Sequence, residues 1–156
     1  MPWAERAAIM CGLFLTLVQA VGLLLRSKRC EVASTDLRVW IPASGLYTYP
    51  DVVVTCGAEN FQDDHFDVLL NPMLIIEVLS PSAEDYDRGH KFCGVSKIPS
   101  MRENLTVAQD RCFVEQWIKR ESTEWMPVSF TNSNATVPLD SIGVAPALAY
   151  VYRNIV

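Results

Sequence analysis

The segment 73–80, with the sequence MLIIEVLS, constrains the fold more than any other part of the chain. Successive residues of a strand point to opposite faces, and here both faces are apolar except at one position. Such a strand is typical of the middle of a sheet that is covered on both sides. The exception is Glu77, because an ionised carboxylate in a buried strand costs several kcal/mol unless a positive charge accompanies it. The sequence therefore predicts a central strand and a partner for Glu77.

The segments on either side of this strand add a helix and two further strands. Ser82 stands three residues before Asp85, which is typical of a helix N-cap followed by an acidic residue in the first turn. We therefore expect a helix over about 83–92. Upstream, residues 30–41 and 48–57 are predicted strands, which could pair as a hairpin or as neighbours in one sheet.

The C-terminal third of the chain predicts more strands. Residues 101–120 indicate two strands around a turn at 109–111, and 125–130 are a candidate third strand. The end, 140–156, is expected to form a terminal strand or a short helix. A chain of 156 residues is most simply one domain. We expect an α/β or α+β fold over residues 1–156, with a central mixed β-sheet flanked by few helices.

Composition narrows the possible functions. The formal net charge of −5 argues against a protein that coats nucleic acid by bulk electrostatics, although it does not exclude an enzyme that acts on nucleic acid. The five cysteines include no CxxC pair, so a zinc site is not expected. We interpret them as small buried side chains in a reducing cytosol, which predicts a cytoplasmic protein.

Residues 7–25 form an uncharged run that is just long enough to span a bilayer. The following RSKRC is a poor cleavage site, so a signal peptide is disfavoured. The Ala, Leu and Met content of residues 7–25 favours a helix of the domain core that is buried on most sides. This helix would belong to an N-terminal helical region over residues 1–29. A membrane segment is the alternative interpretation.

Two carboxylates lie in otherwise apolar strands. Asp51 follows Pro50 at the start of the strand 48–57, and Glu77 lies inside the strand 73–80. If the strands are adjacent, the carboxylate oxygens can converge on a hard cation such as Mg²⁺, with waters completing its coordination. The acidic segment 58–67 also contains a histidine, His65, but is most simply a solvated connection.

Several blocks of this sequence resemble the Uma-two family, which consists of restriction-endonuclease-like proteins of the PD-(D/E)xK nuclease fold. The blocks follow the order and spacing of that family and cover most of the chain from about residue 30. They are TYPDVVV (48–54), PMLIIEVLSPSAEDYDRGHK (72–91), IPSMREN (98–104), VAQDRCFVEQW (107–117) and LDSIGVAPALAYVY (139–152).

The resemblance implies roles for individual residues. The general nuclease pattern has a lysine two residues after the acidic residue, but that position is Leu79 here. In this family the basic residue comes from the following helix, and Lys91 matches that place. The resemblance thus implies that Asp51 and Glu77 bind Mg²⁺ or Mn²⁺ and that Lys91 acts on the attacking water and the phosphate. By its spacing, Asp87, four residues before Lys91 on the same helix face, is a candidate to hold the ammonium group in position, with a simple surface pair as an equal alternative.

Each site residue has a purely structural alternative. Asp51 could cap a strand or form an Asx turn, and Glu77 could form a buried ion pair with Arg88 or Lys91. Lys91 by itself would be a solvated helix residue. Asp36 matches an acidic position of the family and would support the site, but a pair with Arg38 or a backbone turn is an alternative of at least equal weight.

Two functions follow as expectations. The first is a Mg²⁺-dependent DNA endonuclease, working as a homodimer because a cut in both strands needs two sites. The second is a catalytically inactive binding module of the same fold, tethered to a membrane by residues 7–25. Relative to the family the chain is expected to lack an N-terminal strand, as a truncated or repurposed start. Val95 and Asn104 stand where the family commonly has aromatic residues, which bears on activity more than on fold. The basic residues that could contact phosphates, or equally be ordinary surface, are Lys97, Arg102, Arg111, Lys119 and Arg120.

Overall fold

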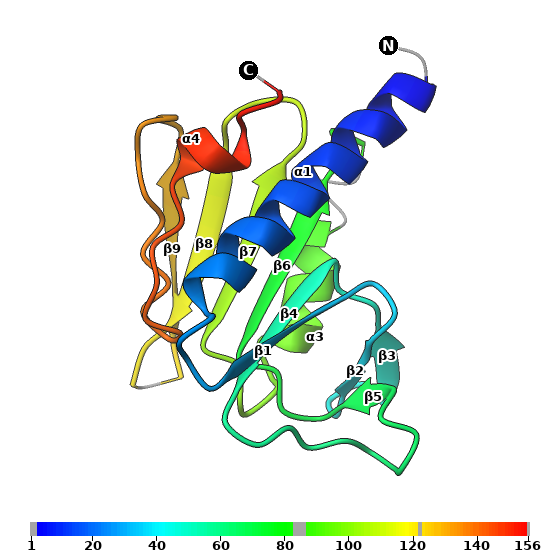
Figure 1. Cartoon of the computed structure of the whole chain (residues 1–156). Helices are drawn as coiled ribbons and strands as arrows, with labels where there is room; N and C mark the ends of the chain where they lie inside the picture. The colour runs from blue at the N-terminus through cyan, green and yellow to red at the C-terminus, as the bar shows by residue number, and fades with distance from the viewer. Residues whose placement is uncertain (1–2, 83–86, 122, 156) are drawn as a thin grey trace.

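A six-stranded mixed sheet forms the centre of the computed structural model, which describes residues 3–82, 87–121 and 123–155 but not the side chains of residues 3, 87 and 88 (Figure 1). The strand order is β1-β4-β6-β7-β8-β9, with β6 and β7 parallel and every other neighbouring pair antiparallel. This arrangement confirms the predicted central mixed sheet. The strands are β1 (Cys30–Ser34), β4 (Val52–Cys56), β6 (Leu74–Leu79), β7 (Glu103–Ala108), β8 (Val114–Lys119) and β9 (Trp125–Phe130).

Strand β6 lies in the interior of this sheet, and all six of its residues are buried. The long helix α1 (Trp3–Leu24) crosses one face of the sheet, and the short helix α4 (Leu148–Val151) packs against α1. The opposite face carries a π-helical turn, η1 (Asp87–Lys91), which continues as α3 (Phe92–Val95). Layers on both faces explain why the strand is apolar on both sides, as its sequence predicts.

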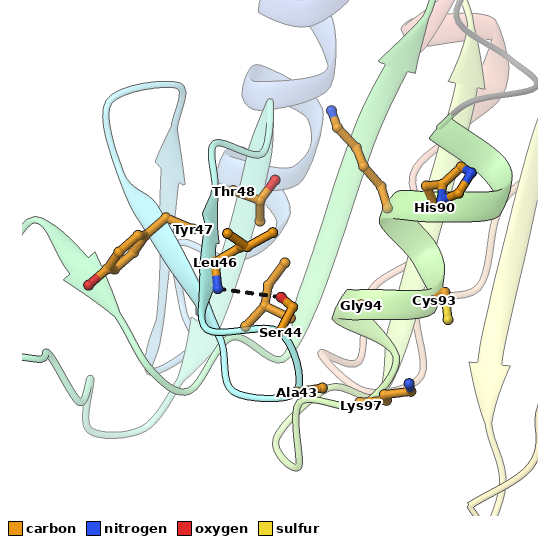
Figure 2. A pocket seen from close by; sticks show the side chains of 11 residues that line it. Ala43, Ser44, Leu46, Tyr47, Thr48, His90, Cys93, Gly94 and Lys97 are labelled. Atoms are coloured by element: carbon orange, nitrogen blue, oxygen red, sulfur yellow. Dashed lines mark hydrogen bonds between the residues drawn. The ribbon is translucent and has the colours of Figure 1, made fainter.

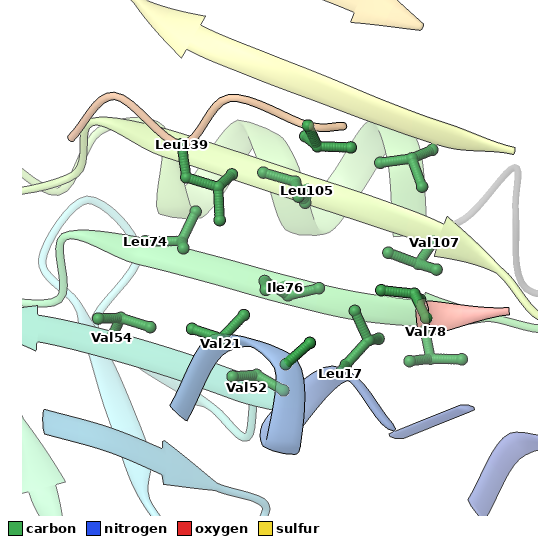
Figure 3. Close-up of a cluster of buried hydrophobic side chains, with 14 of the residues drawn as sticks. Leu17, Val21, Val52, Val54, Leu74, Ile76, Val78, Leu105, Val107 and Leu139 are labelled. Carbon is green, nitrogen blue, oxygen red and sulfur yellow. The ribbon is translucent and has the colours of Figure 1, made fainter. Parts of the chain in front are cut away.

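Two apolar clusters fill the space on the two sides of the sheet. Under α1, Leu17 and Val21 pack against side chains of β4, β6 and β7 (Figure 3). On the other face, Val53 and Ile75 join residues of α3 and of a small second sheet. That sheet has the order β3-β2-β5, with β2 (Arg38–Ile41), β3 (Leu46–Thr48) and β5 (Val68–Leu69).

Helix α1 is less buried than the sequence predicts. Leu13, Leu17 and Val21 are buried against the sheet, whereas Leu15 is 51% and Leu23 53% exposed on the outer side. The expectation of burial on most sides is therefore wrong, because the helix lies on the outside of a single sheet and has only one contact surface. Residues 4–24 are also long and apolar enough to cross a membrane.

The segment 30–41 forms two strands and not the single strand that its sequence indicates. A turn at Thr35 and Asp36 separates them, and the Leu37 amide donates a hydrogen bond to the Ser34 carbonyl at 3.0 Å. The first strand, β1, pairs antiparallel with β4 in the large sheet, and the second, β2, belongs to the small sheet. Because the turn carries no Gly or Pro, the sequence gives little signal of the break.

The structure also corrects the interpretation of the cysteines. Cys30 and Cys56 lie directly opposite each other in β1 and β4 and form a disulfide. Of the others, Cys11 and Cys93 are exposed, so the interpretation of all five as buried thiols is wrong. Since disulfides persist mainly in oxidising compartments, the cysteine content no longer supports a reducing cytosol. The sequence could not reveal the bridge because it depends on the register between two strands.

The predicted strand 48–57 is shorter than expected, because Thr48 ends β3 of the small sheet and β4 begins only at Val52. The other elements agree with the sequence where they are described. Strands β7, β8 and β9 lie at the predicted places, with the turn at 109–111 between the first two, and the chain ends in a short helix. The expected helix over 83–92 is described only from residue 87, so the N-cap at Ser82 and the role of Asp85 lie largely outside the described residues. In the described part, helical structure continues to Val95, three residues beyond the predicted end.

Candidate active site

Glu77 lies in the middle of β6, on the face opposite to α1, and is only 7% exposed. Its neighbour across the sheet follows from the register of β4, in which Val52 pairs with Ile76 and Val53 with Ile75. One further step of this antiparallel register places Asp51 opposite Glu77. The two carboxylates of the sequence hypothesis thus come together at the point where β4 begins.

Asp51 occupies a gap in the hydrogen-bond ladder of β6. Strand β4 begins only at Val52, so β6 extends past it, and the Val78 amide donates to Asp51 Oδ2 at 2.7 Å. The side chain therefore replaces the missing backbone partner of β6. The alternative interpretation, that Asp51 caps a strand, is correct for its Oδ2 atom. The same hydrogen bond also holds the carboxylate beside Glu77.

Lys91 brings a positive charge close to Glu77. Its Nζ lies 3.7 Å from Glu77 Oε1, and about two thirds of the lysine side chain is buried. Lys91 is the last residue of η1, and the next residue, Phe92, stacks on Trp117 at 4.7 Å and meets Trp125 edge-on at 5.3 Å between ring centroids. This aromatic cluster (Phe92, Trp117, Trp125) fixes the end of η1 on β8 and β9 and thereby positions the ammonium group.

The electrostatics of the site favour a cation. Burial raises the pKa of Glu77 from 4.5 to about 8, the charge of Lys91 lowers this pKa, and the negative charge of Asp51 raises it. A carboxyl group with such a pKa holds its proton at neutral pH unless another cation compensates its charge. The ion pair with Lys91 is thus insufficient to ionise Glu77 fully.

The donor set of this site suits a hard divalent cation with bound water. Among the described residues no group of three or more His, Cys, Asp and Glu side chains could hold a metal ion. Mg²⁺ is commonly bound through one or two carboxylates and several waters, so Asp51 and Glu77 fit it. The buried, poorly ionised Glu77 is the observation that supports this fit, because a cation would offset the cost of its charge.

Only one of the two supporting residues of the sequence hypothesis has a described side chain. Asp36 lies in the exposed turn after β1 and lines a hollow together with Phe61 and Asp67. Arg38 pairs with Asp67 and not with Asp36. Asp87 belongs to η1, but its side chain lies outside the described residues, as does the alternative partner Arg88.

Sequence reasoning missed two polar residues beside Glu77. In the register of β6, β7 and β8, Glu77 pairs with Thr106, which pairs with Glu115. Thr106 is 4% exposed, and among the described contacts its hydroxyl has no hydrogen-bond partner. Glu115 accepts a hydrogen bond from Trp117 Nε1 at 3.0 Å. Polar residues at alternate positions of β7 were a visible signal, but their alignment with Glu77 depends on a parallel register that the sequence does not reveal.

Comparison with known proteins identifies the family of the chain. The model of the family described as "Uma2: Putative restriction endonuclease" matches residues 10–148. The chain belongs to the Uma2 family. Membership supports a nuclease-like function, and the six-stranded mixed sheet is consistent with a restriction-endonuclease-like fold.

Two proteins of Synechocystis sp. are relatives of this Uma2 chain. The uncharacterised protein slr1290 is 33% identical over 126 residues, which cover 81% of this chain and 65% of slr1290. The uncharacterised protein sll1609 is 32% identical over 136 residues, which cover 87% of this chain and 77% of sll1609. The chain therefore spans about two thirds of the length of the first relative.

Proposed function

We propose that this Uma2 protein is a metal-dependent endonuclease that hydrolyses phosphodiester bonds in DNA. The observation that supports the proposal best is the contact between Lys91 Nζ and the buried Glu77 carboxylate, 3.7 Å apart, opposite Asp51. Two carboxylates and a lysine on one face of a central sheet form the residue set that the family resemblance implies. Asp51 and Glu77 would hold Mg²⁺ or Mn²⁺.

Each residue has a distinct role in the proposed reaction. The bound cation would polarise the phosphate and lower the pKa of a water molecule. Lys91 lies next to this position, and its ammonium group stabilises negative charge that develops on the phosphate and orients the attacking water. Asp51 is kept in place by the Val78 amide, so one of its oxygens stays available at the site. The hydroxyl of Thr106, on the strand next to Glu77, has no hydrogen-bond partner among the described contacts, and we assign it a supporting role in the site.

A cleavage assay tests this function. Supercoiled plasmid is incubated with the full chain and Mg²⁺, Mn²⁺ or EDTA, and the nicked and linear products are quantified. We expect cleavage with metal only, and a loss of at least about 100-fold for Glu77→Gln and for Lys91→Ala, because each removes a group that acts on the reacting phosphate.

Lys28→Ala is the matched control for Lys91→Ala. It removes the same charge from an exposed position after α1, close to Gly143 and on the α1 side of the sheet. It should cut like the wild type. Equal cleavage by wild type, Glu77→Gln and Lys91→Ala would contradict the endonuclease proposal. Appearance of linear product without prior nicked product would support paired sites in a homodimer.

The exposed outer side of α1 supports a second candidate, a binding module tethered to a membrane through residues 7–25. Under this alternative the carboxylates and Lys91 would form only a structural ion pair. Cell fractionation distinguishes the two: a tethered protein sediments with membranes and resists extraction by high salt and alkaline carbonate. Recovery of all the protein in the soluble fraction would exclude the tether.

A further inference from the structure

A groove lies beside the candidate active site, between the β2–β3 hairpin and the helical segment that carries Lys91 (Figure 2). It encloses about 470 Å³. Ala43, Ser44 and Thr48 lie along one wall, and His90, Gly94 and Lys97 come from the other. The two walls approach closely, since a Cβ atom added to Gly94 would be 3.4 Å from the Ile41 side chain.

The groove has the charge of a site for an anion. The chain contains 18 acidic and 13 basic residues, yet none of the acidic side chains that the structure describes lines the groove, whereas Lys91 and Lys97 both do. In a protein with net charge −5, two lysines among the described lining residues are a local concentration of positive charge. A polyanion is thus the ligand whose charge fits these walls.

The groove is continuous with the candidate site. Lys91 belongs to both, since its ammonium contacts Glu77 and its side chain lines the groove. On the opposite wall, Thr48 is only three residues before Asp51. A chain-like anion whose one phosphate lay at Lys91 could therefore continue along the groove toward Lys97.

The groove offers contacts to a backbone and not to bases. Tyr47 is part of its lining, but its ring points away from it (Figure 2) and packs on Trp40 with 5.0 Å between centroids. The Tyr47 hydroxyl is also engaged, by Gln62 Oε1 at 3.2 Å. Besides Tyr47, the His90 imidazole is the one aromatic ring among the described lining residues, whereas Leu46, 63% exposed, presents an apolar surface suited to sugar carbons. The described walls thus lack the series of Phe, Tyr and Trp platforms on which successive bases stack.

We propose that this groove binds the sugar–phosphate backbone of one strand of the nucleic-acid substrate, with Lys97 pairing with a phosphate next to the one at Lys91. The inference rests on the proposed endonuclease function in one respect, namely that the bound strand is the one to be cut. Binding through phosphates alone is independent of base sequence and strongly dependent on salt.

Binding without cleavage is the appropriate test. Fluorescence anisotropy with labelled DNA of mixed sequence, single-stranded and duplex, is measured in EDTA between 50 and 200 mM salt. Two variants alter the groove at exposed positions outside the candidate active site: Lys97→Ala removes a charge, and Ala43→Glu adds a negative one to the facing wall. Lys28→Ala again removes a charge from the other side of the sheet. Thermal melting of each variant verifies that it is folded.

The proposal makes quantitative expectations. Lys97→Ala should weaken binding about 5- to 10-fold at low salt and reduce the slope of log K against log salt by roughly 0.7 to 0.9, the value for one phosphate contact. Ala43→Glu should weaken binding by at least as much, and Lys28→Ala should leave it unchanged. Oligonucleotides of different sequence should bind within about threefold of one another, because phosphates carry no sequence information.

The outcomes separate this inference from the proposed function. Unchanged binding by both groove variants, or no binding by the wild type at 50 mM salt, would overturn the groove as a nucleic-acid site. A more than tenfold preference for one sequence would overturn recognition through the backbone alone. If the groove variants bind weakly as expected and yet no metal induces plasmid cleavage, the groove stands and the endonuclease function fails.

Discussion

Glu77→Gln should change how the stability of this protein depends on pH. Burial raises the pKa of Glu77 to about 8 in the folded chain, against 4.5 for an exposed glutamate. Between these two values the folded state binds more protons than the unfolded state, so the free energy of unfolding falls as pH rises. At 1.36 kcal/mol per pH unit the total loss from pH 4.5 to 8 is at most about 5 kcal/mol. Glutamine has no charge to bury and avoids this loss.

Urea unfolding of wild type and Glu77→Gln at pH 5, 6, 7, 8 and 9 in EDTA measures the effect. At pH 5 the two proteins should differ by no more than about 1 kcal/mol, because Glu77 stays protonated in the folded chain and pH 5 is only half a unit above the pKa of 4.5 in the unfolded chain. At pH 8 to 9 the variant should be more stable by up to about 5 kcal/mol. Parallel curves for the two proteins from pH 5 to 8 would refute the argument that the carboxylate is costly to ionise.

Repeating the urea unfolding with Mg²⁺ in place of EDTA tests whether the proposed metal site offsets the cost of ionising Glu77. Mg²⁺ binds the ionised carboxylates, so it should recover part of the stability that the wild type loses at pH 8, and it should leave Glu77→Gln unchanged. Because binding must displace the proton on Glu77, the affinity for Mg²⁺ should rise up to about tenfold per pH unit between pH 5 and 8 and then level off. Equal stabilisation of both proteins by Mg²⁺ would place the metal elsewhere.

Three further substitutions test neighbouring parts of the structure. Thr106→Val removes a buried hydroxyl that has no partner among the described contacts, so the free energy of unfolding measured in urea should rise by about 1 kcal/mol. Plasmid cleavage should fall at the same time. A gain in stability without a loss of cleavage would contradict a role of Thr106 in the site. Phe92→Ala removes the aromatic anchor of Lys91; we expect a loss of roughly 2 kcal/mol in urea unfolding and a drop in cleavage of about tenfold or more at temperatures where the variant is fully folded. Glu103→Gln should lower the free energy of unfolding by about 1 to 3 kcal/mol at pH 7, an effect opposite in sign to that of Glu77→Gln. The reason is that both carboxylate oxygens of Glu103 accept hydrogen bonds, one from Gln116 and one from the Ser141 amide. Equal stability of variant and wild type in urea would show these bonds to be dispensable.

Local pattern alone predicts much of the fold. The apolar run of β6 places it in the sheet interior, and the strands β7, β8 and β9 lie in the segments that the sequence indicates as strands. These elements were predictable because burial on a strand depends only on which face each residue occupies. The break after Ser34 was not, since Thr35 and Asp36 carry no strong turn signal and the two halves are stabilised by different sheets.

The candidate site was only partly predictable for the same reason. Glu77 and Asp51 are conspicuous as charges in apolar strands, and Lys91 follows from the family resemblance. Thr106 gave a weaker signal, because a threonine in a strand is ordinary and its place beside Glu77 depends on the register of β6 with β7. The disulfide between Cys30 and Cys56 escaped prediction likewise, since it joins residues that become neighbours only in the folded sheet.

The displaced lysine links the candidate site to the packing of the sheet. A lysine at position 79 would share a strand and a face with Glu77, and its position would follow from the strand alone. Lys91 instead reaches Glu77 from a short helical segment, which is fixed to β8 and β9 by the contacts of Phe92 with Trp117 and Trp125. Changes in the aromatic cluster should therefore move the ammonium group without touching either carboxylate. In this chain the strength of the Lys91–Glu77 pair depends on strands at the far side of the sheet, and mutations there should affect the proposed chemistry more than their distance suggests.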